Sequence, residues 1–146
     1  MRLLVLNGVN LGRLGSREPE VYGTTTHAQL ARACVQAGAQ LDAEVEVRQT
    51  DSESECIGWL YEAFDAAVPV VLNPGAWAHT SHALRDAVAA RTVPVVEVHL
   101  SNIAAREAFR HTSVVSEVVD GVITGLGPAG YLLALQYLAE RSRTTA

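Results

Sequence analysis

Glu97 and His99 are separated by one residue in an apolar segment that ends in polar side chains. If this segment is a strand, its alternate residues lie on one face of the sheet, and the carboxylate lies beside the imidazole. A carboxylate can orient an imidazole and favour its protonated form, which can act as a general acid. The same spacing also fits a structural role in which Glu97 is a cap or an ion-pair partner.

A tyrosine and two arginines follow the first apolar run, at Arg13, Arg17 and Tyr22. A guanidinium close to a phenol favours the phenolate, which can remove a proton from a substrate. Loop arginines and tyrosines commonly lie on the surface without such a role. Tyr22 is therefore a candidate base on condition that this segment folds over the site. For Arg110, a surface salt bridge and a functional role fit the spacing equally well.

His79 and His82 lie three residues apart and could bind a metal together with His99. The alternative is one histidine in a pocket and one in solvent. No carboxylate lies at ligand spacing beside them, so we expect no metal.

Gly125, Gly127 and Gly130 match the pattern G-x-G-x-x-G, which is typical of dinucleotide-binding turns. Only sixteen residues follow Gly130, too few for the second strand and the acidic ribose ligand of such a unit. We expect these glycines to allow a tight turn and close helix packing instead, and we expect no cofactor.

Composition excludes several classes of protein. All eleven basic residues are arginine, so Schiff-base chemistry and a lysine-dependent phosphate loop are impossible. The net charge of -5, without a basic face interleaved with aromatic residues, argues against nucleic acid. The first apolar run is too short for a signal peptide or a membrane span, so we expect a cytoplasmic protein. Cys34 and Cys56 are expected to be buried free thiols.

Apolar runs and helical patterns alternate along the 146 residues. The predicted strands cover residues 2–6, 45–49, 70–72 and 93–98, with a fifth around 122–123. The predicted helices cover residues 27–38, 56–67, 81–91, 103–109 and 131–141. Thr26 with Gln29, and Ser52 with Glu55, have the spacing of capping boxes.

This alternation predicts an α/β fold, a flavodoxin-like three-layer sandwich whose five-stranded parallel sheet has the order 2-1-3-4-5. We expect a single catalytic domain over residues 1–146. Ligands of such sheets bind beyond the carboxyl ends of the strands, near the point where strands 1 and 3 meet. Those ends carry polar side chains: Asn7, Asn10, Asn73, His79, His99, Ser101 and Asn102. The long segment after strand 1 predicts a lid at about residues 12–25.

Five segments resemble the motifs of type II 3-dehydroquinate dehydratases. The first is LNGVNLGRLGSREPEVYG at residues 6–23. NPGAWAHTSHALRDA at 73–87, EVHLSN at 97–102, REAFRHTS at 106–113 and GLGPAGYLLAL at 125–135 match later motifs in the same order. The resemblance covers essentially the whole chain.

The resemblance implies a hydro-lyase that converts 3-dehydroquinate to 3-dehydroshikimate by anti-elimination of water through an enolate, without an imine or a cofactor. This step belongs to the shikimate pathway, which leads to chorismate and the aromatic amino acids. In the family pattern Tyr22 is the base, assisted by Arg17. Asn10 helps to hold the enolate, and His99, backed by Glu97, protonates the departing hydroxyl.

The resemblance also assigns the binding residues. Asn73 and the segment of Leu100 and Ser101 would bind the substrate carboxylate, while His79 and Arg110 would bind ring hydroxyls. Asp86 matches a residue that reaches the active site of a neighbouring subunit. This implies a homo-oligomer built from trimers, usually a dodecamer.

Two positions depart from the family pattern. Val9 stands where proline is common, so the turn that carries Asn10 loses a fixed φ. Ala104 stands where histidine is frequent. The alternative to the enzyme is a non-catalytic flavodoxin-like module that binds a flavin or an anion, although the segment after strand 1 lacks the Ser/Thr-rich phosphate cradle of such modules.

Overall fold

A parallel sheet forms the centre of the computed structural model, which describes residues 1–16 and 18–146. Its five strands have the order β2-β1-β3-β4-β5, and every neighbouring pair is parallel. They are β1 (Arg2–Asn7), β2 (Glu44–Gln49), β3 (Val70–Asn73), β4 (Val95–His99) and β5 (Gly121–Thr124). The predicted fold class and strand order are confirmed.

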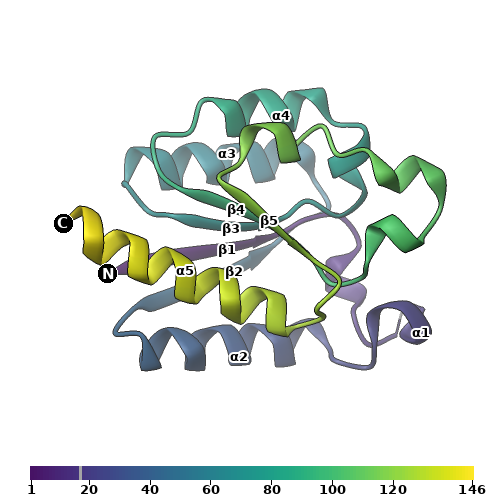
Figure 1. Ribbon diagram of the computed structural model, residues 1–146, viewed down its shortest axis with the longest axis horizontal. Coiled ribbons are helices and arrows are strands. Elements are labelled where there is room, and N and C mark those ends of the chain that lie inside the picture. Colours follow the sequence, from purple (N-terminus) through teal and green to yellow (C-terminus); the bar gives the residue numbers. More distant parts are fainter. Residues whose placement is uncertain (17) are drawn as a thin grey trace.

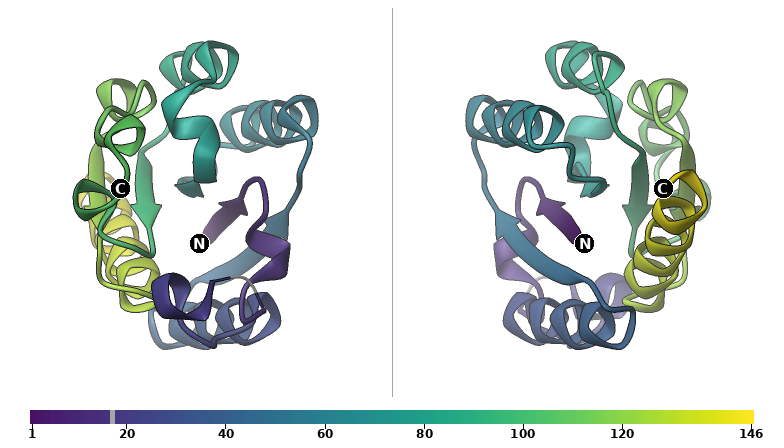
Figure 2. Two further views of the ribbon diagram at one scale, coloured as in Figure 1. Left: turned by 90° about the vertical axis from the view of Figure 1, so that its right-hand side faces the viewer. Right: turned by 90° about the vertical axis from the view of Figure 1, so that its left-hand side faces the viewer.

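Helices cover both faces of the sheet (Figure 1). The helices α2 (His27–Gln40) and α5 (Ala129–Thr145) lie on one face. The helices α3 (Glu53–Asp65) and α4 (His82–Ala89) lie on the other, as the views along the strands also show (Figure 2). Among the described residues, no helix combines the length and the apolar character that crossing a bilayer requires.

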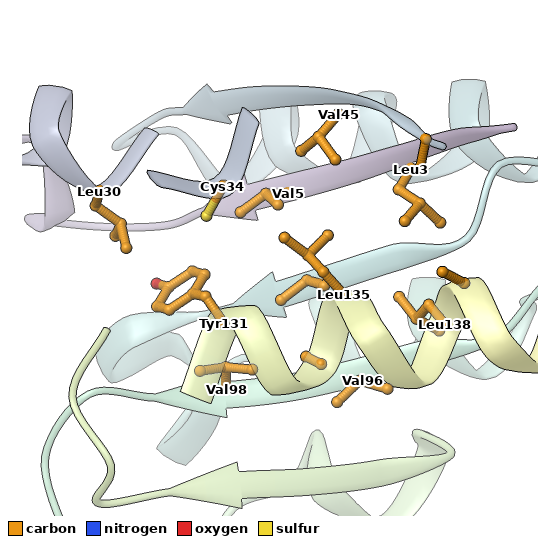
Figure 3. Close-up of a cluster of buried hydrophobic side chains, with 14 of the residues drawn as sticks. Leu3, Val5, Leu30, Cys34, Val45, Val96, Val98, Tyr131, Leu135 and Leu138 are labelled. Atoms are coloured by element: carbon orange, nitrogen blue, oxygen red, sulfur yellow. The ribbon is translucent and has the colours of Figure 1, made fainter. Parts of the chain in front are cut away.

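Two apolar cores, one on each face of the sheet, explain why the sequences of the strands are continuous apolar runs. Successive residues of a strand point to opposite faces, so Leu3 and Val5 pack toward α2 and α5, where Cys34 and Leu135 meet them (Figure 3). The alternate side chains pack against α3 and α4, where the second core contains Leu4, Leu6, Cys56, Leu60, Val70, Leu72, Leu84 and Val95.

Side-chain caps set where the helices begin. Thr26 and Gln29 form the predicted capping box at the start of α2, with both reciprocal hydrogen bonds present. Ser52 Oγ accepts the N–H of Glu55, so α3 starts directly after its cap, three residues before the predicted start at residue 56.

Short helical turns form the segments around the site, and one prediction there is wrong. The connection after β1 contains a 3-10 turn at Leu11–Arg13 and the short helix α1 (Pro19–Tyr22). The helix predicted over residues 103–109 is wrong, because two 3-10 turns, Ile103–Ala105 and Ala108–His111, occupy this region. Between them, Arg106 is extended with φ −107° and ψ −161°, which interrupts any helix there.

The glycine pattern after β5 serves the turn into α5. Gly125 has a φ of +88°, a conformation that favours glycine. A Cβ at Gly130 would lie 3.2 Å from Cγ2 of Ile123, a tight contact that glycine avoids where α5 packs on the sheet. Both observations agree with the predicted turn-and-packing role.

Candidate active site

The predicted ligand site is a pocket at the carboxyl ends of β1, β3 and β4. Most of the residues that the sequence singled out line it together: Asn10, Tyr22, Asn73, His79, His99, Leu100, Ser101 and Arg110. Val9, Leu11, Gly75, Ala76, Ile103 and Arg106 complete the lining. Arg17, predicted to assist Tyr22, lies outside the described residues.

Glu97 and His99 face the same side of β4, as their spacing predicted. Glu97 is completely buried, and its Oε1 lies 3.6 Å from His99 Nε2. This separation is longer than a hydrogen bond, and His99 Nε2 has no hydrogen-bond partner among the described residues.

Two serines keep Glu97 ionised in the protein interior. Ser113 Oγ donates to Glu97 Oε1 at 3.0 Å, and the hydroxyl of Ser116 donates to Glu97 Oε2. Burial opposes ionisation of Glu97, but His99 and the two hydroxyls outweigh it and hold the pKa of this carboxyl below its ordinary value. Neither serine was singled out from the sequence.

Tyr22 is held by an arginine that the sequence did not single out. Nη1 of Arg106 donates to the Tyr22 hydroxyl at 2.8 Å, and the Arg106 guanidinium carbon lies 5.0 Å from the centre of the phenol ring. The same nitrogen donates to Ser101 Oγ at 3.3 Å. Arg106 therefore brings a positive charge to Tyr22 and ties α1 to the end of β4.

Asn10 is held by its backbone conformation and by contacts from the end of β2, in a turn where Val9 stands in place of the proline common in the family pattern. Asn10 is in the left-handed conformation with a φ of 68°, which asparagine tolerates better than most residues. Its N–H donates to Asp51 Oδ1 at 2.8 Å. Nε2 of Gln49 donates to the same carboxylate oxygen at 3.1 Å and to the carbonyl of Gly8 at 3.2 Å. These contacts from the end of β2 fix the turn without a proline.

The predicted binding side chains surround the same pocket. Asn73 ends β3 and is buried, while Leu100 and Ser101 follow β4 directly. The ring of His79 stacks on that of His99 with 6.4 Å between the centres, and its Nδ1 lies 2.8 Å from the carbonyl oxygen of Thr112. Nε of Arg110 donates to Glu107 at 2.7 Å.

Asp86 does not belong to the pocket of its own chain. It lies on α4, its side chain is 77% exposed, and it pairs with Arg85 at 3.2 Å. The structure thus separates Asp86 from the other site residues that it describes.

Comparison with known proteins identifies the family. The family model described as dehydroquinase class II matches residues 1–139. The chain belongs to the class II dehydroquinase family. A Salinispora tropica protein named 3-dehydroquinate dehydratase is 63% identical over 98% of this chain and 100% of its own length.

Solved structures of type II dehydroquinases support the same family assignment. The type II dehydroquinase of Propionibacterium acnes is 57% identical, with a TM-score of 0.94, over 95% of this chain and 96% of that one. The type II dehydroquinase of Butyrivibrio crossotus is 39% identical, with a TM-score of 0.93, over 94% of this chain and 97% of that one. Membership in this family leaves the non-catalytic binding module without support.

The dehydroquinase site contains supporting residues that sequence reasoning missed. Arg106 lies within the matched motif at residues 106–113, so its motif position was the signal that could have found it. Ser113 ends the same motif, whereas Asp51 and Ser116 lie outside the matched motifs and act through contacts with residues at least 19 positions away, which no spacing rule predicts.

Proposed function

We propose that this chain eliminates water from 3-dehydroquinate to give 3-dehydroshikimate, with the side chains of this pocket as the whole catalytic apparatus. The observation that carries the proposal is the meeting of a phenol held by an arginine and an imidazole backed by a buried carboxylate in one pocket. An elimination through an enolate needs a base and an acid of this kind.

In the first step, Tyr22 removes the proton on the carbon next to the ketone. The electron pair of the broken C–H bond moves onto the ketone oxygen and gives an enolate. Arg106 supports the phenolate from 2.8 Å, and Arg17 takes the assisting role that the family pattern assigns to it. Asn10, held by Asp51, helps to stabilise the developing negative charge on the oxygen.

In the second step, the enolate collapses, the C–O bond to the leaving hydroxyl breaks, and His99 donates the proton that turns this hydroxyl into water. Glu97 stabilises the protonated imidazole before the transfer. The product is a conjugated enone. Base and acid are distinct groups, so they can act on opposite faces of the substrate, as an anti-elimination requires.

The remaining polar groups hold the substrate. Asn73 and the segment of Leu100 and Ser101 bind the carboxylate, and His79 and Arg110 bind ring hydroxyls. Residues at about 12–25 act as a lid, since Tyr22 lines the pocket from this segment. We place the reaction in a single catalytic domain in the cytoplasm.

The assembly is a homo-oligomer built from trimers, with Asp86 completing the site of a neighbouring subunit. Asp86 is exposed on its own chain, which suits a role in trans. Exposed apolar side chains on β5 and α5 also favour burial against another subunit: Val122, Leu133 and Tyr137. A dodecamer of four trimers is the assembly that the family pattern implies.

The test is the ultraviolet absorbance of the enone during incubation with 3-dehydroquinate in the presence of a chelator. Wild-type protein should produce the signal. Tyr22→Phe should fold normally and lose about a thousandfold in kcat, because it has no base. Tyr61→Phe is the matched control, since Tyr61 lies on α3 away from the pocket. A folded wild-type protein without any enone signal would overturn the proposal.

A further inference from the structure

A buried tyrosine on α5 touches the residue proposed to bind the substrate carboxylate. Tyr131 is completely buried in the first turns of α5, and its hydroxyl points toward the carboxyl ends of the strands (Figure 3). It accepts a hydrogen bond from Nδ2 of Asn73 at 2.7 Å and donates one to Oδ1 of Asn7 at 2.7 Å. Asn7 and Asn73 are register partners on β1 and β3, so the hydroxyl bridges their two amides.

The direction of this hydrogen-bond chain is fixed at one end by the backbone. The N–H of Gly75 can only donate, and it donates to Oδ1 of Asn73 at 3.0 Å. Nδ2 of Asn73 must then face Tyr131, whose hydroxyl hydrogen must point to Asn7.

The same logic continues to the start of α2. Nδ2 of Asn7 lies 3.0 Å from Nε2 of His27, which must accept and therefore carries no proton. Burial lowers the pKa of His27, which favours this neutral form. The side chains of Asn73, Tyr131, Asn7 and His27 thus form a chain in which each hydrogen bond is donated in the same direction, from Asn73 toward His27.

We propose that Tyr131 is a positioning residue that holds the Asn73 carboxamide in the orientation that binds the substrate carboxylate. Nδ2 of Asn73 has two hydrogens. Tyr131 accepts one of them, and the other remains for a ligand in the pocket that Asn73 lines. Without the hydroxyl, only the N–H of Gly75 still holds the amide, so Nδ2 is aimed less firmly at the carboxylate. This inference rests on the proposed role of Asn73.

Packing alone does not require this hydroxyl. A buried phenol must recover the hydration that it loses, and a phenylalanine would fill the same space among Val5, Cys34 and Val98 without that cost. Burial also raises the pKa of Tyr131, so it stays protonated and cannot replace Tyr22 as a base. The role left for the Tyr131 hydroxyl is to accept one hydrogen bond and to donate another.

The first experiment compares Tyr131→Phe with wild type under the enone assay. We expect KM for 3-dehydroquinate to rise about tenfold, the value of one neutral hydrogen bond, with kcat within a factor of two. Leu135→Val is the matched control, because Leu135 lies one turn further along the same buried face of α5 and has no polar contact. It lowers the unfolding temperature through packing alone and should leave KM unchanged.

A double-mutant cycle tests whether Tyr131 affects KM through Asn73. Asn73→Ala should raise KM, and adding Tyr131→Phe to it should cause no further rise, because the residue that Tyr131 positions is already gone. Equal KM values for Tyr131→Phe and wild type, or additive effects in the cycle, would overturn the role of Tyr131 and leave the dehydratase function intact. An inactive wild type would instead overturn the proposed function.

A measurement on the wild-type protein covers the case in which Tyr131→Phe does not fold. Nitrogen-15 NMR should find His27 with its proton on Nδ1 and none on Nε2 at neutral pH. A proton on Nε2 would reverse the chain from His27 through Asn7 to Tyr131, and would overturn the proposal without any substitution.

Discussion

Arg106 reaches Tyr22 across 84 positions of sequence, and Ser113 and Ser116 reach Glu97 across 16 and 19. In both cases a side chain that is proposed to transfer a proton, or to support the one that does, gains its partner from the irregular segment after β4. The pairing of Glu97 with His99 could be predicted, because it follows from the two-residue period of a strand. The contacts of Arg106 and the serines could not, because they depend on how a loop folds back over the sheet.

Replacing Arg106 with methionine should lower kcat by about 10- to 100-fold, the range for one hydrogen bond to a charged group. The reason is the loss of the positive charge that supports the Tyr22 phenolate. Arg106→Lys should recover part of the rate, because it keeps the charge without the planar fork. Steady-state kinetics on the folded variants measures the effect. Arg2→Met is the control, since Arg2 is exposed at the opposite end of β1; an unchanged kcat for Arg106→Met would exclude the role.

Replacing Ser116 with alanine should shift the acid side of the stability profile. The pKa of Glu97 is lower in the folded protein, so its stabilising contribution is present at neutral pH and is lost as the pH falls through the folded pKa. Removing one hydroxyl donor raises the pKa of Glu97, so this loss should begin at a higher pH. Unfolding midpoints measured between neutral pH and about pH 3 test the shift.

Ser142→Ala is the matched control for this experiment. The Ser142 hydroxyl donates only to the Leu138 carbonyl, within α5. Its removal should leave the loss of stability at acid pH in the same pH range as in wild type. If Ser116→Ala also leaves this pH range unchanged, Ser116 does not stabilise the ionised form of Glu97.

At the scale of elements, the strands, their order and the main helices could be predicted because apolar periodicity and side-chain caps are local signals. The capping box of Thr26 and Gln29 located the start of α2 to the residue. The short helix α1 and the 3-10 turns have no apolar period, since they are only three to five residues long. They are held by contacts such as that of Arg106 with Tyr22, which is why the helix prediction over residues 103–109 was wrong.

Two glycines with open surroundings offer a paired test of the α1 segment. At both Gly23 and Gly58, an added Cβ would meet no other described part of the chain within 4 Å, but Gly23 alone has a positive φ, +77°. Gly23→Ala should therefore strain the turn after Tyr22 by about 1–3 kcal/mol and reduce kcat/KM at least about tenfold. Because this strain exists only in the folded state, the unfolding temperature should also fall by a few degrees.

Gly58→Ala should do the opposite. Gly58 lies within α3, where alanine is the better helix former by about 1 kcal/mol, so the unfolding temperature should rise with activity unchanged. Calorimetry and the enone assay on both variants separate strain near the site from a general effect of glycine replacement. Full activity in Gly23→Ala would show that the turn does not position Tyr22.

For the whole molecule, the exposed position of Asp86 makes a complementation experiment possible. Asp86→Ala and Tyr22→Phe should each be nearly inactive alone. After dissociation and reassembly of an equal mixture, a site is active when it has its own Tyr22 and a neighbour with Asp86, so about one quarter of wild-type activity should return for a cyclic arrangement. Reassembly of either variant by itself is the control. No recovery in verified mixed oligomers would exclude the action of Asp86 in trans.

The two faces of the sheet separate the proposed acid from the amide proposed to bind the substrate carboxylate. Asn7, Asn73 and Tyr131 lie on the side of α2 and α5, whereas Glu97 and its serines lie on the side of α3 and α4. An engineer who wishes to accept a bulkier or differently charged acid can therefore redesign the interior beneath α5 and leave the acid on β4 untouched. Conversely, a library restricted to Ser113 and Ser116 would tune the acid and leave the hydrogen bonds that orient Asn73 untouched.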